Sequence, residues 1–284
     1  MNLEKYKVSK KVKLQDFNTK EVVDNAEKQL KKLRKKLSKI QNKMYAEGKY
    51  GALICIQGMD TAGKDSLIRE VFKDVNARGV IVHSFKVPTE LELKHDFLWR
   101  HYIALPAKGK LGIFNRTHYE NVLVTRVHPA YILGENIPNI KSVNDINDDF
   151  YHDRMERINQ FENHLTKSGT IVLKFFLHLS KEEQKNRLLR RLNLPEKNWK
   201  FSEGDLKERK LWDKYQDCYE DVLNRTSKEN APWFVVPADD KTSARLILAE
   251  ILVEEFKKYD FKEPVLSKKV SHRIDEFKAQ LNNE

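Results

Sequence analysis

The sequence predicts an α/β fold, with a central parallel sheet of five strands covered by helices on both faces. Five short apolar runs, rich in Ile, Val, Leu and Phe, alternate along the chain with longer segments of helical periodicity. This alternation is typical of parallel sheets, because parallel neighbours need a crossover connection that is usually helical. The first run also leads directly into a glycine-containing turn and a helix, an order common where α/β proteins bind ligands.

The first predicted strand is a continuous apolar run, as expected for a strand buried on both faces, and the other predicted strands are largely apolar. The predicted strands lie at residues 52–56, 80–85, 111–114, 170–179 and 233–236. The predicted helices lie at residues 65–76, 95–104, 120–127 and 147–167, with two more within 180–226 and a last one at 243–259. Residues 129–145 contain two prolines and a glycine, and we expect an irregular loop there.

Length, cysteine content and the first residues narrow the class of protein. The 284 residues suffice for a large core, and no apolar run approaches the length of a transmembrane helix. Residues 1–11 lack the apolar segment of a secretory signal. Cys55 and Cys218 are too few for a disulfide framework and lie outside any metal-ligand spacing. We therefore expect a cytoplasmic protein without a zinc site and without a membrane partner.

The net charge of +11 points to an anionic partner, but most of it lies in one segment. Residues 28–49 carry nine Lys or Arg and one Glu, which leaves about +3 for the rest of the chain. An apolar stripe at helical spacing predicts that this segment is an amphipathic helix; its members are Leu30, Leu33, Leu37, Ile40 and Met44. We expect the stripe to pack on the core, with a helix that docks on a polyanion or a membrane as the alternative.

A predicted phosphate-binding loop follows the first strand. Residues 58–64, Gly-Met-Asp-Thr-Ala-Gly-Lys, fit G-x-x-x-x-G-K between a strand and a helix, the setting that a P-loop requires. Backbone N–H groups and the positive end of the helix dipole would surround the phosphate oxygens, and Lys64 would reach the terminal phosphates. The predicted phosphate-binding residues here are Met59, Thr61, Ala62, Gly63, Lys64, Asp65 and Ser66.

Two carboxylates distinguish this loop. Asp65 stands where a Ser or Thr hydroxyl commonly binds Mg²⁺, and Asp60 lies inside the loop itself. A carboxylate in an anion-binding loop repels phosphate unless a cation lies between them. We therefore predict that Asp60 binds Mg²⁺, or Mn²⁺ in its place, and that Asp65 is a second ligand. For Asp65 the alternative is a favourable interaction with the helix dipole.

Polar residues also follow the third strand, at the sheet edge where ligands bind. Asn115 stands where an acidic metal-binding residue is expected, and its amide could orient a metal-bound water. Arg116 can hold a phosphate through two hydrogen bonds. His118 is interpreted as a hydrogen-bonded structural residue, with a general base as the alternative.

Several blocks of sequence closely resemble the polyphosphate kinase 2 family: residues 58–72, 97–102, 112–128, 157–162 and 183–223. Asn115, followed by Arg-Thr-His-Tyr-Glu, looks like the subgroup that phosphorylates both AMP and ADP, since other members carry Asp at this position. The resemblance implies a three-layer P-loop kinase fold similar to thymidylate kinase, with a mobile helical lid. It also implies a homo-oligomer, either a homodimer or a homotetramer, and Mg²⁺-dependent phosphoryl transfer between polyphosphate and AMP, ADP or ATP.

The chain then divides into three predicted parts. Residues 1–48 form an N-terminal extension, residues 49–262 the kinase domain with its lid at about 181–212, and residues 263–284 a C-terminal tail helix. In the lid Arg187 and Arg191 share a helical face. Arg190 lies beside them and Lys197 and Lys200 are on the following loop, and these three are predicted to bind phosphate. The predicted catalytic residues are Asp60, Lys64, Arg116, Arg187 and Arg191; for the lid arginines the alternative is a solvated helix face.

The acceptor nucleotide has a separate set of candidates. They are Asp96, Phe97, Arg100, Asn115, Glu120 and Asn121. Phe97 is equally well explained as part of the core. If Glu120 borders the acceptor, its charge is expected to favour AMP over the more highly charged ADP.

Two other functions compete with polyphosphate-dependent transfer. One is a nucleoside monophosphate kinase that uses ATP as donor. The other is a non-catalytic polyanion-binding protein. Residues 181–210 carry ten Lys or Arg against six acidic residues, which favours a long polyanionic donor. No RNA-binding aromatic motif or zinc-finger spacing is present in the sequence, so we expect no nucleic acid partner.

Overall fold

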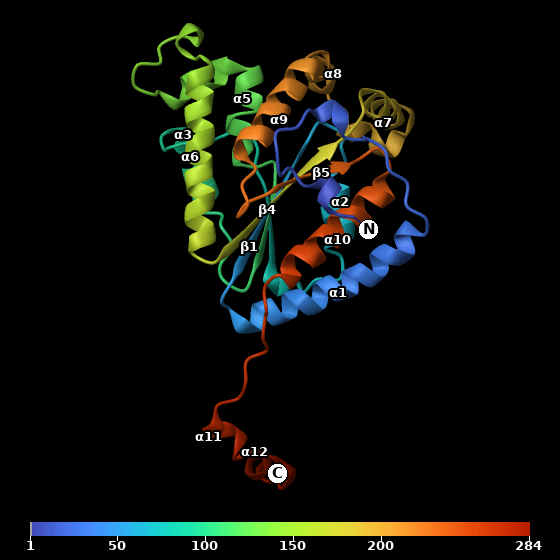
Figure 1. Ribbon diagram of the computed structural model, residues 1–284, viewed down its shortest axis with the longest axis vertical. Coiled ribbons are helices and arrows are strands. Elements are labelled where there is room, and N and C mark those ends of the chain that lie inside the picture. The colour runs from blue at the N-terminus through green and yellow to red at the C-terminus, as the bar shows by residue number, and fades with distance from the viewer. Residues whose placement is uncertain (1) are drawn as a thin grey trace.

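Five parallel strands form the central sheet, in the spatial order β2-β3-β1-β4-β5 (Figure 1). The computed structural model describes residues 2–284, and Met1 lies outside this described part. The strands are β1 (Gly51–Gly58), β2 (Val80–Ser84), β3 (Leu111–Asn115), β4 (Thr170–His178) and β5 (Trp233–Pro237). Because each pairing is parallel, the carboxyl ends of all the strands meet at one edge of the sheet. The predicted α/β class and the position of each predicted strand are confirmed.

Helices connect the strands and cover both faces of the sheet (Figure 1). They are α1 (Ala26–Glu47), α2 (Lys64–Val71), α3 (Glu90–Leu93), α4 (Trp99–Tyr102), α5 (Val124–Val127), α6 (Asp148–Lys167), α7 (Lys181–Asn193), α8 (Glu203–Lys210), α9 (Trp212–Thr226), α10 (Lys241–Lys257), α11 (Lys268–Ser271) and α12 (Ile274–Asn282).

Several helix boundaries differ from the sequence prediction. α2 ends at Val71 and not at residue 76, because the Asn76 side chain accepts a hydrogen bond from the N–H of Arg78 and caps a new turn. Three helices replace the predicted two between residues 180 and 226, since Pro195 begins a separate 3-10 turn after α7. The predicted helices at 95–104 and 120–127 are only short turns of helix. The predicted irregular loop contains the 3-10 helices Pro129–Glu135 and Val143–Asp145.

Alternate residues of β1 face two different layers of helices. Ala52 and Ile54 lie in one apolar core with α1, α2 and α10. Leu53 and Cys55 face the opposite side and share a core with residues of α6. The sheet is therefore the middle of three layers, and α1 packs on the outer side of α10 (Figure 1).

The N-terminal segment packs against β5 and α9. The N–H of Val8 donates to the carbonyl of Trp233 at 2.9 Å, next to an antiparallel bridge between Lys7 and Phe234. Val12 forms hydrogen bonds of 2.8 and 2.9 Å with the side chain of Asn224. Residues 2–48, the described part of the predicted extension, thus share a core with the sheet, α2 and α10.

The C-terminal segment behaves differently. After Phe261, whose ring packs against Tyr50, the chain leaves the body, and α11 and α12 lie apart from it (Figure 1). Apolar side chains on this segment are exposed, including Val265 at 93% and Leu281 at 69%. Among the described helices, none has the length and apolar character needed to cross a membrane.

Candidate active site

The P-loop connects the end of β1 to the start of α2. Its backbone enters the left-handed region at Thr61 (φ +67°) and Gly63 (φ +99°), so the turn between Gly58 and Lys64 closes tightly. The Lys64 ammonium folds back and donates to the carbonyl oxygens of Gly58 (2.6 Å) and Met59 (3.3 Å). Removal from water lowers the pKa of Lys64, although Asp60 opposes this shift. These hydrogen bonds hold Lys64 inside the predicted phosphate-binding loop.

Asp60, Arg116 and Glu120 form a charged group beside this lysine. The Asp60 carboxylate lies 3.5 Å from the Arg116 guanidinium. Arg116 has φ +59°, a strained conformation for a side chain of this size and one that is concentrated at functional sites. Glu120 accepts a hydrogen bond of 3.0 Å from Gln57, and burial raises the pKa of its carboxyl even though Arg116 opposes the shift.

Asp65 and Asn115 are joined directly. The Asn115 amide donates to the Asp65 carboxylate at 2.6 Å and to the Ser84 hydroxyl at 3.2 Å. The buried Oδ1 of Asn115 has no hydrogen-bond partner among the described residues. The ends of β2 and β3 and the start of α2 therefore present oxygen atoms to one place.

Arg187 occupies a position that the sequence did not indicate. It was predicted to clamp phosphate from a mobile lid, but only 6% of its surface is exposed. All of its N–H groups face protein oxygens: it donates to Glu183, to the carbonyls of Thr61 and Ala62, and to those of Ala238 and Asp239. Arg187 therefore has a bracing role: its hydrogen bonds connect α7 to the P-loop and to the end of β5. No donor of its side chain is left for a phosphate in this conformation.

The other lid cations are more open to solvent. Arg191 donates to the Asp205 carboxylate (2.9 Å) and the carbonyl of Lys200 (3.1 Å). Burial and the nearby Asp60 raise the pKa of Asp205, although Arg191 opposes the shift. Within residues 2–284, Arg190, Lys197 and Lys200 have no acidic side chain at ion-pair distance, so their charges are available to an anionic ligand.

These groups surround a cavity of about 730 Å³ above the P-loop. Its cationic lining consists of Lys64, Arg69, Arg116, Arg187, Arg190, Arg191, Lys197, Lys200, Lys241 and Arg245. Its acidic lining consists of Asp60, Asp65 and Asp205, so positive charge is in excess by seven. Sequence reasoning missed Arg69, Asp205, Lys241 and Arg245. Lys241 could have been found, since it follows the carboxyl end of the fifth strand, where α/β sheets bind ligands.

The predicted acceptor residues do not gather at this cavity. Asn115 lines it, but Asp96, Phe97, Arg100, Glu120 and Asn121 are not part of its lining. Phe97 stacks against Arg154 with 4.6 Å between guanidinium and ring centroid. Arg100 donates to the carbonyl of Lys86 at 2.9 Å. The roles in nucleotide binding of the five residues outside the lining stay predictions.

Comparison with known proteins decides the family. The family described as polyphosphate kinase 2 matches residues 20–264. The chain belongs to the polyphosphate kinase 2 family. It is 48% identical to the ADP-polyphosphate phosphotransferase of Rhodopseudomonas palustris over 219 residues, 77% of this chain and 75% of that protein. It is 47% identical over 222 residues to the AMP/ADP-polyphosphate phosphotransferase of Meiothermus ruber, 78% of each chain.

A solved structure extends the likeness to the whole fold. The crystal structure of polyphosphate kinase 2 from Arthrobacter aurescens superposes with a TM-score of 0.88 at 34% identity. The match covers 98% of this chain and 95% of that one. The resemblance inferred from the sequence is thereby confirmed, together with the P-loop kinase fold.

A buried polar network supports the loop that carries Arg116. His118 Nε2 lies 3.0 Å from Glu162, which also accepts from the Tyr119 hydroxyl at 2.8 Å and pairs with Lys174. Lys174 donates further to the carbonyl of Thr226 at 2.7 Å. His118 is completely buried, so its interpretation as a structural residue is confirmed.

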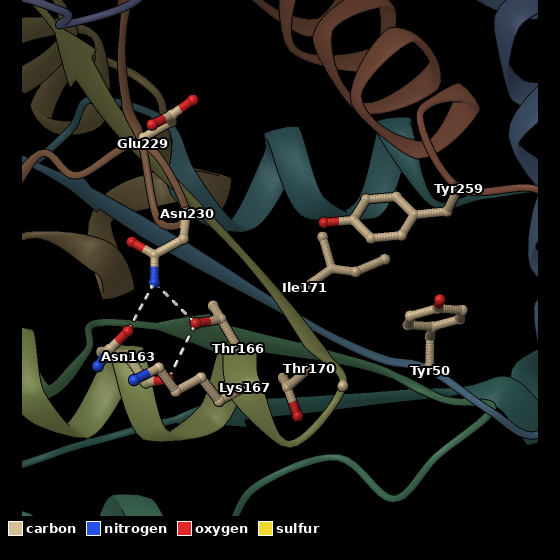
Figure 2. A pocket seen from close by; sticks show the side chains of 10 residues that line it. Tyr50, Asn163, Thr166, Lys167, Thr170, Ile171, Glu229, Asn230 and Tyr259 are labelled. Carbon is tan, nitrogen blue, oxygen red and sulfur yellow. Dashed lines mark hydrogen bonds between the residues drawn. The ribbon is translucent and has the colours of Figure 1, made fainter.

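A second cavity lies at the opposite edge of the sheet. Tyr50, Gly169 and Thr170, which line it, mark the amino-terminal ends of β1 and β4 (Figure 2). Figure 2 shows Asn230 pointing toward Asn163 and Thr166, with hydrogen bonds of 3.2 and 2.7 Å. Lys167 and Glu229 are its charged lining residues, so this cavity lacks the cation excess found at the P-loop.

Proposed function

We propose that this protein transfers the terminal phosphoryl group of inorganic polyphosphate to AMP and to ADP, giving ADP and ATP, in a reversible reaction. The observation that carries the proposal is the cavity whose cations continue beyond the P-loop, from Lys64 to Lys241 and Arg245. A nucleotide donor ends within the P-loop, whereas a long polyanion needs cations beyond it. The names of the relatives from Rhodopseudomonas palustris and Meiothermus ruber support the same donor and acceptors.

The polyphosphate would lie along this cationic wall. Lys64 and Arg116 would bind the reacting phosphates, and Arg190, Lys197 and Lys200 would bind phosphates farther from the reaction centre. In this structure Arg187 acts as a positioning residue, because its contacts hold Thr61 and Ala62 of the P-loop in place. Arg191 would exchange its contact with Asp205 for one with phosphate when the lid closes.

Transfer would proceed by in-line displacement. An oxygen of the terminal phosphate of AMP or ADP attacks the terminal phosphorus of polyphosphate. The bond from that phosphorus to the bridging oxygen breaks, and the shortened polyphosphate leaves with the electron pair. The attacking phosphate is already ionised at neutral pH, so no general base is required. The arginines and lysines of the site neutralise charge on the transferring group, which is the main contribution of proteins to this reaction.

The residues at the P-loop fit a divalent metal ion. Within residues 2–284 no three His, Cys, Asp or Glu side chains form a complete metal site. Mg²⁺ is commonly held by one or two carboxylates together with substrate phosphates, and Asp60 and Asp65 offer such a pair beside the unpartnered Oδ1 of Asn115. Bound Mg²⁺ or Mn²⁺ would supply charge neutralisation between these carboxylates and the phosphates. We propose Asp60 as the main ligand.

Oligomeric state and location belong to the same proposal. We propose a homodimer or homotetramer, supported by apolar residues exposed on the edge strand β2, where Val82 is 48% exposed. Sedimentation of the whole protein measures this state, and a monomer at micromolar concentration would contradict it.

A cytoplasmic location is supported by Cys55 and Cys218, which are both buried as free thiols.

The direct test is an assay of products. The protein is incubated with Mg²⁺ and polyphosphate and with either AMP or ADP, and the nucleotides are separated by chromatography. ATP from both acceptors supports the proposal, and ATP from ADP alone would restrict the acceptor. Turnover of AMP with ATP but not with polyphosphate would favour the nucleoside monophosphate kinase. Retention of polyphosphate without turnover would favour the non-catalytic binding protein.

A further inference from the structure

The cationic wall of the active-site cavity leads directly to helix α1. Arg69 of α2 and Arg245 of α10 both belong to the lining of this cavity. Arg69 pairs with Glu70 at 2.9 Å, and Arg34 of α1 donates to the carbonyl of Glu70 at 2.5 Å and to its carboxylate at 3.2 Å. One residue, Glu70, therefore joins the edge of the cavity to the middle of α1.

The helical spacing of α1 places some of its lysines on the side that faces this junction. Arg34 and Glu27 mark that side, since they pair with each other and Arg34 contacts α2. At 3.6 residues per turn, Lys31 and Lys35 project within about 100° of Arg34. Lys36 and Lys43 project about 160° or more away from it, into solvent on the far side.

The charge on α1 is not neutralised by the protein. Lys28, Lys31, Lys32, Lys35, Lys36, Lys39 and Lys43 are all exposed. Within residues 2–284, the ion pairs of the segment from Ala26 to Lys49 are those of Arg34 with Glu27 and Glu70 and that of Lys49 with Glu47. Solvation alone accounts for isolated lysines, but a row that continues the lining of an anion-binding cavity offers a path to a long anion.

We propose that α1 carries an outer binding site for polyphosphate, formed by Lys31 and Lys35 and reached from the cavity past Arg245 and Arg69. The inference rests on the proposed function, because the ligand is the same polyphosphate chain whose end reacts at Lys64. A long chain occupies the cavity and α1 together, whereas a short chain occupies the cavity alone. The outer site raises the affinity for long chains through a second, tethered contact and leaves the chemical step unchanged.

The test compares two double variants of equal charge. Lys31→Gln with Lys35→Gln removes the proposed site, and Lys36→Gln with Lys43→Gln removes the same charge from the far side of the same helix. Gln is a good helix former, so α1 is retained, and thermal melting of each variant checks this. We expect about a fivefold rise in KM for long-chain polyphosphate in the first variant only. We expect unchanged kcat, unchanged KM for short linear polyphosphate, and loss of the difference at high salt.

Other outcomes overturn the inference. An equal rise in KM for long-chain polyphosphate in the two double variants would show a general effect of net charge and no outer site. A rise in KM for short and long chains alike would place the lysines' effect in the reaction site. If the first variant lost only its sedimentation with anionic phospholipid vesicles, the ligand of α1 would be a membrane surface. Failure of the proposed function is recognised separately, because then the unsubstituted protein makes no product from short or long polyphosphate.

Discussion

The Asp60 carboxylate lies 3.5 Å from the Arg116 guanidinium, and both side chains line the cavity above Lys64. An anionic substrate that enters must share Arg116 with Asp60, so Asp60 hinders phosphate binding unless a cation is bound beside it. We predict that Asp60→Asn lowers kcat by about a hundredfold or more and weakens the dependence of the rate on Mg²⁺ concentration. Steady-state rates across a Mg²⁺ titration measure both effects.

Asp74→Asn is the matched control for this prediction, since Asp74 is an exposed carboxylate just beyond α2. Its rate and Mg²⁺ dependence are expected to equal those of the unsubstituted protein. A near-normal kcat in Asp60→Asn would remove Asp60 from the proposed metal site.

Arg187 and Arg190 are three residues apart, but we predict different consequences when each is replaced by lysine. Arg187→Lys cannot reach the carbonyls of Thr61, Ala62, Ala238 and Asp239 together, and buried acceptors lose their partners. We expect a loss of about 3 kcal/mol in the free energy of unfolding and a lower kcat. Arg190→Lys keeps its charge and is expected to change stability little. Urea unfolding and steady-state kinetics of both variants test this prediction. Equal free energies of unfolding for the two variants would contradict the bracing role of Arg187.

Lys241 provides a test of the cationic wall through pH. Burial lowers the pKa of Lys241 to about 8, and Arg187 and Arg190 add to the shift. As the pH rises through this value the free protein loses one positive charge from the wall, so kcat/KM for polyphosphate should fall. Lys241→Arg remains charged and is expected to retain kcat/KM at higher pH. Coincident pH profiles of the two proteins would exclude Lys241 from polyphosphate binding.

The buried pair of Glu162 and Lys174 should be costly to break. Burial alone would raise the pKa of Glu162, but Lys174 and His118 more than offset it and hold the pKa below its usual range. The stability that this carboxylate contributes is therefore complete above the usual pKa of a glutamate and is lost as the pH falls through the lowered value. We predict that Glu162→Gln or Lys174→Met alone costs about 3–5 kcal/mol of unfolding free energy.

The double variant of this pair is the control. Removing both partners leaves no uncompensated charge, so it is expected to cost less than the sum of the two single substitutions. Strict additivity in urea unfolding would show that the two side chains do not act as a pair.

The sheet and the P-loop could be predicted from sequence because their signals are local. Each strand is a largely apolar run, and the loop from Gly58 to Lys64 has a fixed spacing. The two roles of the lid arginines could not be predicted in the same way. Arg187 and Arg191 lie four residues apart on α7 and share one helical face. The packing of α7 nevertheless places only Arg187 against the P-loop. That difference arises from tertiary contacts, which periodicity does not contain.

The far end of the site was missed for a similar reason. Arg245 lies inside α10, more than 170 residues after Lys64, and joins it only because β4 and β5 follow β1 in the sheet. The spatial order of strands is not encoded in any single segment. For the same reason a sequence division at residue 48 could not reveal that α1 and residues 6–8 complete the core around α10 and β5.

The packing of the N-terminal segment against α9, β5 and α10 has a consequence for biosynthesis. Val12 binds Asn224 and α1 packs on α10, so these N-terminal residues find their native partners only after about 200 further residues have been synthesised. At about 5–20 residues per second the amphipathic α1 waits on the order of 10–50 s with its apolar stripe uncovered. The lysine-rich exterior keeps the nascent segment strongly charged during this interval, which opposes premature association with other chains.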